Sequence, residues 1–282
     1  MTYEDILYEV ADGVATITIN RPAKLNAARN QTHDELVDAL DRSDGDDSVR
    51  ALIFTGTGRA FCSGTDLSGA KFSGRSGDPA TGDGVTPDYA AKVPLRIYEM
   101  NKPVIGALNG IAVGFGASVL CSMDIRLAAE SARVGFVYAR RGICNESCSS
   151  WFLPRLVGIS RAVEWVATGR MISAACLESA GFVSAVVPDH NLLPRARELA
   201  REIADHTSPA SVAVSRRLMW NMLSAGHPRE ATKFESRGLT GLMNLPDAKE
   251  GAASFLEKRP PRFITRPSQD LSFVDQWWMQ GE

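Results

Sequence analysis

Short apolar runs in the first half of the chain predict a sheet. The β-branched run Val14–Ile19 and the runs at residues 50–55, 103–108 and 124–128 are rich in strand-forming residues. The run at 50–55 is apolar almost throughout and stops at a glycine, which is typical of a buried parallel strand. Between the first two runs, leucine and valine recur at helical spacing over residues 33–42 and predict an amphipathic helix.

From residue 160 onward the hydrophobic spacing is helical. The predicted helices cover residues 161–168, 174–180, Leu192–His206, 209–223, Pro228–Met243 and 247–257. A strand-rich part therefore precedes a helix-rich tail, and the class is α/β. Residues 68–88 hold five glycines and few large apolar side chains, which predicts a loop.

Composition and charge exclude several classes of protein. The chain has 282 residues, 44% of them hydrophobic, and a net charge of −2, which argues against a general nucleic-acid binder. Glycines and an asparagine interrupt the longest apolar stretch, residues 103–123, so we expect no membrane span. Five cysteines and an acidic N-terminus without signal-peptide character favour reduced thiols and a cytoplasmic location. Cys144 and Cys148 have no nearby histidine or second cysteine pair, so no metal site is predicted.

Two glycine-bearing segments are the best candidates for chemistry. Residues 60–67 and 109–117 place small residues where the backbone can approach a ligand. The second segment runs into a predicted small-residue helix, whose first turn carries free N–H groups suited to an oxyanion. Taken alone, such turns are more often structural than catalytic. Neither segment has the spacing of a nucleotide-phosphate loop.

Together these segments resemble the crotonase (enoyl-CoA hydratase/isomerase) superfamily. The motifs that carry the resemblance occur in family order between residues 3 and 263. They are Asn20-Arg21-Pro22 with Leu25-Asn26-Ala27, residues 61–67, residues 109–116, Gly169-Arg170 with residues 180–183, and Glu250-Gly251 with residues 255–259. The resemblance implies a spiral of ββα turns over residues 1–205 and a helical C-terminal oligomerisation region over residues 206–282. It also implies trimers, or pairs of trimers, and an acyl-CoA substrate. No separate cofactor is expected, because coenzyme A is part of the substrate.

The resemblance assigns the two oxyanion N–H groups to Thr65 and Phe115. Hydratases of the family carry two glutamates, but the matching positions here are Ser118 and Tyr138. With Gly114, these two residues are expected to line the substrate pocket. Without the two carboxylates, water cannot be activated in the way usual for the family.

Residues 142–150 resemble the segment in which some family isomerases carry a single catalytic glutamate. This assigns Glu146 as the proton shuttle. The alternative is that Glu146 caps a helix beginning at Ser147, because a glutamate at a helix start is common.

Coenzyme A needs cationic and backbone partners for its phosphates. The resemblance assigns this contact to the backbone near Leu25 and Ser63, with Phe255 and Lys258 supplied by a neighbouring subunit. Leu67 is expected to join it, and Arg21 and Lys24 are candidates for additional cations. The alternative for each lysine, considered individually, is that its charge simply faces the solvent. His33 is expected on a surface-like helix, no histidine forms a triad, and Cys62 is expected to pack rather than react.

The favoured function is an isomerase that moves a double bond of an acyl-CoA into conjugation with the thioester, in fatty acid metabolism. Three alternatives remain open. They are a hydratase (a lyase) with nonstandard acid and base groups, an acyl-CoA hydrolase or dehalogenase using Glu146, and a non-catalytic acyl-CoA binder.

Overall fold

Two sheets form the body of the molecule, which the computed structural model describes over residues 2–68 and 88–274. The larger sheet has six strands, parallel except for the pairing of β1 with β2. In order of pairing they are β1 (Ile6–Ala11), β2 (Val14–Ile19), β3 (Ala51–Gly56), β5 (Val104–Leu108), β7 (Ile125–Ala129) and β10 (Ala185–Val187). All six residues of β3 are buried, because the sheet is covered on both faces.

The smaller sheet has four short strands, with one antiparallel pair at its end. They are β4 (Ala60–Cys62), β6 (Ile111–Val113), β8 (Arg133–Gly135) and β9 (Met171–Ser173). Strands β4 and β6 run parallel and directly follow strands or turns of the larger sheet along the chain. The chain therefore passes repeatedly from one sheet to the other, as expected for a spiral of strand pairs and helices.

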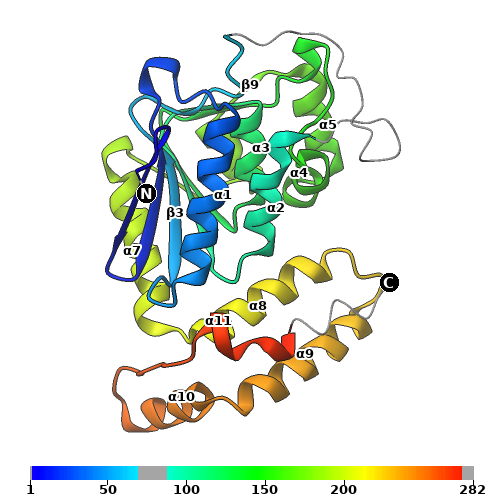
Figure 1. The fold of residues 1–282 in the computed structure, drawn as a ribbon. Coiled ribbons are helices and arrows are strands. Elements are labelled where there is room, and N and C mark those ends of the chain that lie inside the picture. Colours follow the sequence, from blue (N-terminus) through cyan, green and yellow to red (C-terminus); the bar gives the residue numbers. More distant parts are fainter. Residues whose placement is uncertain (1, 69–87, 275–282) are drawn as a thin grey trace, which may run out of the picture.

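Helices cover the larger sheet on opposite sides, with α1 (Asn30–Gly45) on one and α7 (Leu192–His206) on the other (Figure 1). The helix α3 (Phe115–Ser122) is buried at every position, and a Cβ on Gly116 would lie only 2.2 Å from the Cys62 carbonyl oxygen, so no larger residue fits at that position. The remaining helices of the body are α2 (Lys92–Glu99), α4 (Ser149–Val157), α5 (Ile159–Thr168) and α6 (Ala174–Ser179).

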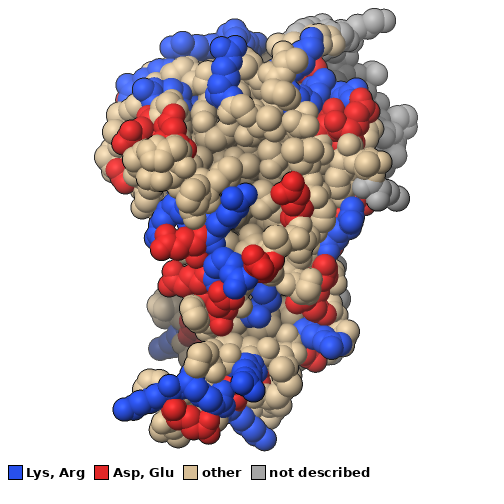
Figure 2. Space-filling model, turned by 90° about the vertical axis from the view of Figure 1, so that its left-hand side faces the viewer, with Lys and Arg blue, Asp and Glu red and all other residues tan. Residues whose placement is uncertain are grey.

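The C-terminal helices extend away from this body (Figure 1). They are α8 (Pro209–Met222), α9 (Pro228–Met243), α10 (Pro246–Glu257) and α11 (Pro267–Asp270). At the narrow waist between body and tail, Figure 2 shows acidic and basic side chains intermixed, in keeping with the near-zero net charge. None of the described helices is long and apolar enough to cross a membrane.

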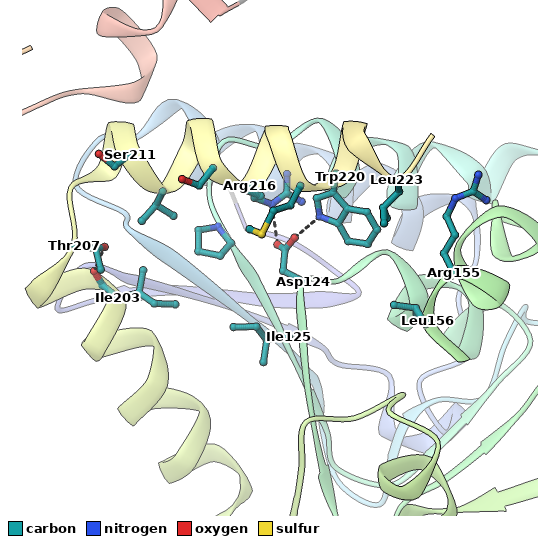
Figure 3. A pocket seen from close by; sticks show the side chains of 14 residues that line it. Asp124, Ile125, Arg155, Leu156, Ile203, Thr207, Ser211, Arg216, Trp220 and Leu223 are labelled. Carbon is teal, nitrogen blue, oxygen red and sulfur yellow. Dashed lines mark hydrogen bonds and ion pairs between the residues drawn. The ribbon is translucent and has the colours of Figure 1, made fainter. Parts of the chain in front are cut away.

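A charged pair holds α8 against the body. Arg216, only 4% exposed, bonds through Nε to Asp124 Oδ2 at 2.9 Å and donates to the backbone carbonyls of Ile97, Tyr98 and Met100. Beside this pair lies a mostly apolar cavity of about 700 Å³ (Figure 3). Its lining contains none of the residues proposed for chemistry.

The α/β architecture and the helical tail agree with the sequence prediction. The helix predicted at residues 33–42 is longer, spanning Asn30–Gly45, and the helix expected to begin at Ser147 begins at Ser149. The short strands of the smaller sheet and α2 were missed. Of the glycine-rich loop predicted at residues 68–88, residues 69–87 lie outside the described part of the chain.

Candidate functional site

The two glycine segments meet where β4 and β6 end. Because these strands are parallel, Gly64 and Gly114 leave the sheet at the same edge. Both have positive φ, +100° and +53° respectively, a conformation that favours glycine. A Cβ placed on Gly114 would lie 3.7 Å from the Cα of Gly64. The backbones that continue into Thr65 and Phe115 are therefore neighbours.

The N–H groups of Thr65 and Phe115 are available to a ligand. Ala28 pairs with the chain on either side of Thr65, through its N–H to Gly64 O and its carbonyl to Asp66 N–H, both at 2.8 Å. Phe115 is the first residue of α3, where an N–H has no acceptor within the helix. Within residues 2–68 and 88–274, neither N–H group bonds to a protein acceptor.

The Glu146 carboxylate lies at the same junction. Its Oε1 would be 3.5 Å from a Cβ placed on Gly114. Burial raises the pKa of the Cys62 thiol to about 12, and the negative charge of Glu146 adds to this increase. Cys62 is therefore a protonated, packed thiol, as expected from the sequence.

The helix after Glu146 does not begin where a capping role for this glutamate would require. The N-cap of α4 is Cys148, two residues later, and Glu146 contributes its backbone carbonyl to Ser149 N–H at 3.0 Å. Ser147 and Cys148 both adopt left-handed conformations, with φ of +50° and +59°. The chain thus makes a tight left-handed turn between the glutamate and the helix.

Ser118 and Tyr138 form a closed pair beside Gly114. Their hydroxyl oxygens are 2.5 Å apart, and Ser118 also donates to the Gly114 carbonyl at 3.0 Å. Both side chains are buried, and burial raises the pKa of Tyr138 well above its usual range. At physiological pH the pair is neutral, so these two positions supply no carboxylate.

Comparison with known proteins decides the family. Residues 9–266 match the model of the enoyl-CoA hydratase/isomerase family. This chain belongs to that family. An enoyl-CoA hydratase of Alternaria alternata is 40% identical over 255 residues, covering 90% of this chain and 83% of that protein. The 1,2-epoxyphenylacetyl-CoA isomerase of Escherichia coli (strain K12) is 33% identical, covering 92% of this chain and 98% of that protein.

Solved structures of enoyl-CoA hydratase/isomerase proteins share the fold. The enoyl-CoA hydratase of Bacillus anthracis superimposes with a TM-score of 0.84 at 30% identity, covering 92% of this chain and 99% of that chain. The crotonase fold expected from the motifs is thereby confirmed. The chain is an enzyme of the enoyl-CoA hydratase/isomerase type.

Of the positions expected to contact coenzyme A, three lie together. Ser63 donates from its N–H to Leu25 O at 3.0 Å and from its hydroxyl to Lys24 O at 3.4 Å. Leu67, which is 53% exposed, lies two residues beyond Thr65. Phe255 and Lys258 are exposed at the far end of α10, away from these loops within one chain (Figure 1).

Two residues whose role was not predicted from the sequence, Asn26 and Arg21, tie these loops together. Asn26 accepts from Arg21 N–H at 2.9 Å and donates to the carbonyls of Thr57 and Ala60. Arg21 also bonds to Asp66 Oδ2 at 2.9 Å, one residue past Thr65. The Asn-Arg-Pro and Leu-Asn-Ala motifs contained this signal, because a polar residue in a tight turn often bonds to local backbone.

The expected surface position of His33 was wrong. The side chain is 3% exposed, and its ring centroid lies 4.5 Å from that of Phe115. Burial, followed by the nearby Lys92 charge, lowers the pKa of His33 to about 4. Among the described residues neither ring nitrogen has a hydrogen-bond partner, and no cluster of three or more metal-ligating side chains occurs. His33 is thus a neutral ring packed behind the second glycine segment.

Proposed function

We propose that this enzyme moves the double bond of a 3-enoyl-CoA into conjugation with the thioester, with Glu146 as the only acid–base group. The carboxylate takes the proton from the α-carbon and the same group returns it at the γ-carbon. The observation that carries the proposal is the approach of Glu146 to Gly114, at the junction of the two glycine segments.

The two backbone N–H groups hold the intermediate. Removal of the α-proton leaves a dienolate whose negative charge gathers on the thioester oxygen. Donors that are already in position stabilise this charge without rearrangement, and each such donor typically contributes about 3–4 kcal/mol. The free N–H groups of Thr65 and Phe115 suit this role because their segments lie side by side.

The Ser118–Tyr138 pair argues against the hydration mechanism usual in this family. Hydration needs one group to activate water and another to protonate the α-carbon. Both hydroxyls here bond to each other, and Tyr138 holds its proton tightly because it is buried. A single carboxylate is sufficient for a proton shuttle, since no water enters the product.

Hydration with a nonstandard set of residues is the second candidate. The observation in its favour is the 40% identity to a protein named as an enoyl-CoA hydratase, which exceeds the 33% identity to the named isomerase. In that case Glu146 would activate the water and a hydroxyl of the Ser118–Tyr138 pair would have to relay the second proton.

Binding of the coenzyme A portion is assigned to Lys24, Leu25, Ser63 and Leu67, completed by Phe255 and Lys258 of a neighbouring subunit. Phe255 is 82% exposed and belongs to α10, which lies in the C-terminal tail away from the body that carries the other four residues (Figure 1), and both facts support this arrangement. We expect trimers or pairs of trimers, because large apolar side chains are exposed along the C-terminal helices. A sedimentation experiment that finds a monomer at micromolar concentration would exclude this assembly.

Product analysis on a panel of substrates separates the candidates. The panel contains 2-enoyl-, 3-enoyl- and aryl-CoA thioesters, and the products are examined by mass and by double-bond position. Isomerisation leaves the mass of a 3-enoyl-CoA unchanged while the double bond moves. A gain of one water from a 2-enoyl-CoA would instead identify a hydratase, release of free coenzyme A a hydrolase, and binding without turnover a non-catalytic protein.

A further inference from the structure

We propose that Asp88 is a positioning residue for catalysis, which holds the turn that carries Glu146. This inference rests on the proposed role of Glu146 as the base. Asp88 lies 59 residues before Ser147, just ahead of the short 3-10 helix Tyr89–Ala91 that leads into α2. It joins two parts of the chain that no sequence motif links.

The two oxygens of the Asp88 carboxylate accept hydrogen bonds from different segments. One oxygen, Oδ2, accepts the backbone N–H of Ser147 at 2.7 Å and its hydroxyl at 3.3 Å. The other, Oδ1, accepts the N–H of Ala90 at 3.1 Å. Hydrogen bonds to an ionised carboxylate are shorter and stronger than those between neutral groups. Asp88 therefore holds the residue next to Glu146 while being fixed itself.

The turn after Glu146 needs such an external partner. Ser147 and Cys148 are consecutive residues with positive φ, and neither is a glycine, asparagine or aspartate that adopts this conformation readily. Such strain persists only where surrounding structure maintains it. Ser147 is 1% exposed, so its N–H would have no water to replace the Asp88 carboxylate.

The other side of the turn is already fixed. Asn145 donates to the Ser149 hydroxyl at 3.2 Å, and the Ser149 N–H donates to the Glu146 carbonyl at 3.0 Å. Asp88 is thus the contact that fixes the turn from the α2 side. Its loss lets the backbone at Ser147 relax, which moves the carboxylate of Glu146 away from the glycine junction. A displacement of this kind costs rate rather than binding, because catalysis depends on the position of the base to within about 1 Å.

The test uses Asp88→Ala in the full-length protein, measured on the best substrate of the panel. We expect kcat to fall by about tenfold to a hundredfold. KM should stay within about twofold, while the thermal midpoint should fall by a few degrees because the buried Ser147 N–H loses its acceptor. Asp88→Asn keeps an acceptor oxygen, should recover most of the rate, and serves if the alanine variant folds poorly. The matched control is Asp34→Ala, which removes a carboxylate bonded to Tyr89 and Lys92 of the same segment but not to Ser147, and should leave kcat unchanged.

A second substitution separates positioning from general stability. Ser147→Gly accepts the left-handed conformation without a tether, so in the Asp88→Ala background it should restore much of kcat. If Asp88→Ala keeps the full kcat while Glu146→Gln is inactive, the positioning role is wrong and the proposed function stands. If kcat falls, KM rises several-fold and Ser147→Gly restores no kcat, Asp88 is only structural and the inference is overturned. If Glu146→Gln itself keeps full turnover, the proposed function fails and this inference fails with it.

Discussion

Two carboxylates, Asp124 and Glu146, lie in different parts of the molecule and next to different groups. Asp124 receives three protein donors, from Val104 N–H at 2.8 Å, Arg216 Nε at 2.9 Å and Trp220 Nε1 at 2.6 Å. It lines the cavity of about 700 Å³ beneath α8 (Figure 3). Glu146 lies in a left-handed turn next to two glycine segments whose N–H groups are available.

The difference shows that space alone does not identify the reactive group. Asp124 accepts hydrogen bonds from three donors, one on β5 and two on α8, so its role is to hold those elements together. The cavity beside Asp124 therefore lies at a structural junction. Glu146 is near the groups that would stabilise an enolate, so chemistry is expected there.

The first prediction concerns Glu146→Gln, which keeps the shape of the side chain and removes the base. We expect turnover to fall by roughly a hundredfold to ten-thousandfold, the range usual for a positioned acid or base. This corresponds to about 3–5 kcal/mol of transition-state stabilisation. Acyl-CoA binding, measured by calorimetry, should persist. If the variant keeps the wild-type turnover, Glu146 is not the base, and the proposed difference in role between Glu146 and Asp124 is wrong.

The control for this substitution is Ser118→Ala, in the neighbouring closed pair. It removes one hydroxyl and no charge, so the rate should fall by less than about tenfold. If the serine variant loses as much activity as Glu146→Gln, the pair takes part in proton transfer and the hydratase mechanism gains support.

The second prediction tests the structural side of the comparison. Arg216→Leu leaves Asp124 without its charged partner and removes the donor from three buried carbonyls. The free energy of unfolding should fall by about 3–5 kcal/mol, as for other broken buried pairs. Urea unfolding measures this loss, and the rate per folded molecule should stay close to wild type. A loss below about 1 kcal/mol would show that α8 is held by apolar contacts instead.

The two regions compared here also differ in how far they could be predicted from the sequence. Strands β2, β3, β5 and β7 were predictable because their composition is local evidence, and the glycine segments were predictable from their motifs. The three-residue strands β4 and β6 are too short to show a period. A charged residue such as Arg216 has the sequence pattern of an exposed helix position, so its burial could not be foreseen.

The same reason explains the error at His33. Its burial depends on Phe115, a residue brought to it by the spiral rather than by sequence proximity. The contact of Asp88 with Ser147 is of this kind too. Long-range contacts between polar groups leave no periodic pattern, so only the folded chain identifies them.

The third prediction uses the pKa of His33, which is about 4 in the folded protein against 6.5 for an exposed histidine. Because the unfolded chain binds the proton more readily, the stability that His33 contributes should be lost as the pH falls from about 6.5 to 4, and the His33 contribution should not change further below this range. The contribution is at most roughly 3 kcal/mol. His33→Phe should flatten this slope in urea unfolding measured at several pH values. An unchanged slope would mean that His33 is not the titrating group.

The prediction with the smallest expected effect tests whether Gly114 matters for turnover or only for the backbone conformation of its turn. Gly114→Ala adds a methyl group 3.5 Å from Glu146 Oε1 at a positive φ, so it should reduce turnover by about tenfold and stability by about 1–2 kcal/mol. Gly142→Ala is the matched control, because Gly142 also has a positive φ but has no atom within 4 Å of the added carbon. The control should lose no turnover and less stability, because Gly142 is in the left-handed helical region with ψ of 24°, whereas Gly114 has ψ of −122°. Equal losses of turnover would show that the junction has no special role.

The measurement that tests the central claim most directly is exchange of the α-hydrogen in D2O. A saturated analogue of the best substrate can be neither isomerised nor hydrated, so its exchange reports only removal and return of the α-proton. The account predicts that the wild-type enzyme incorporates deuterium at the α-carbon and that Glu146→Gln, although it binds the analogue, does so at least about a hundredfold more slowly. Exchange at the wild-type rate in the Glu146→Gln variant would contradict the account, because another group would then be the base.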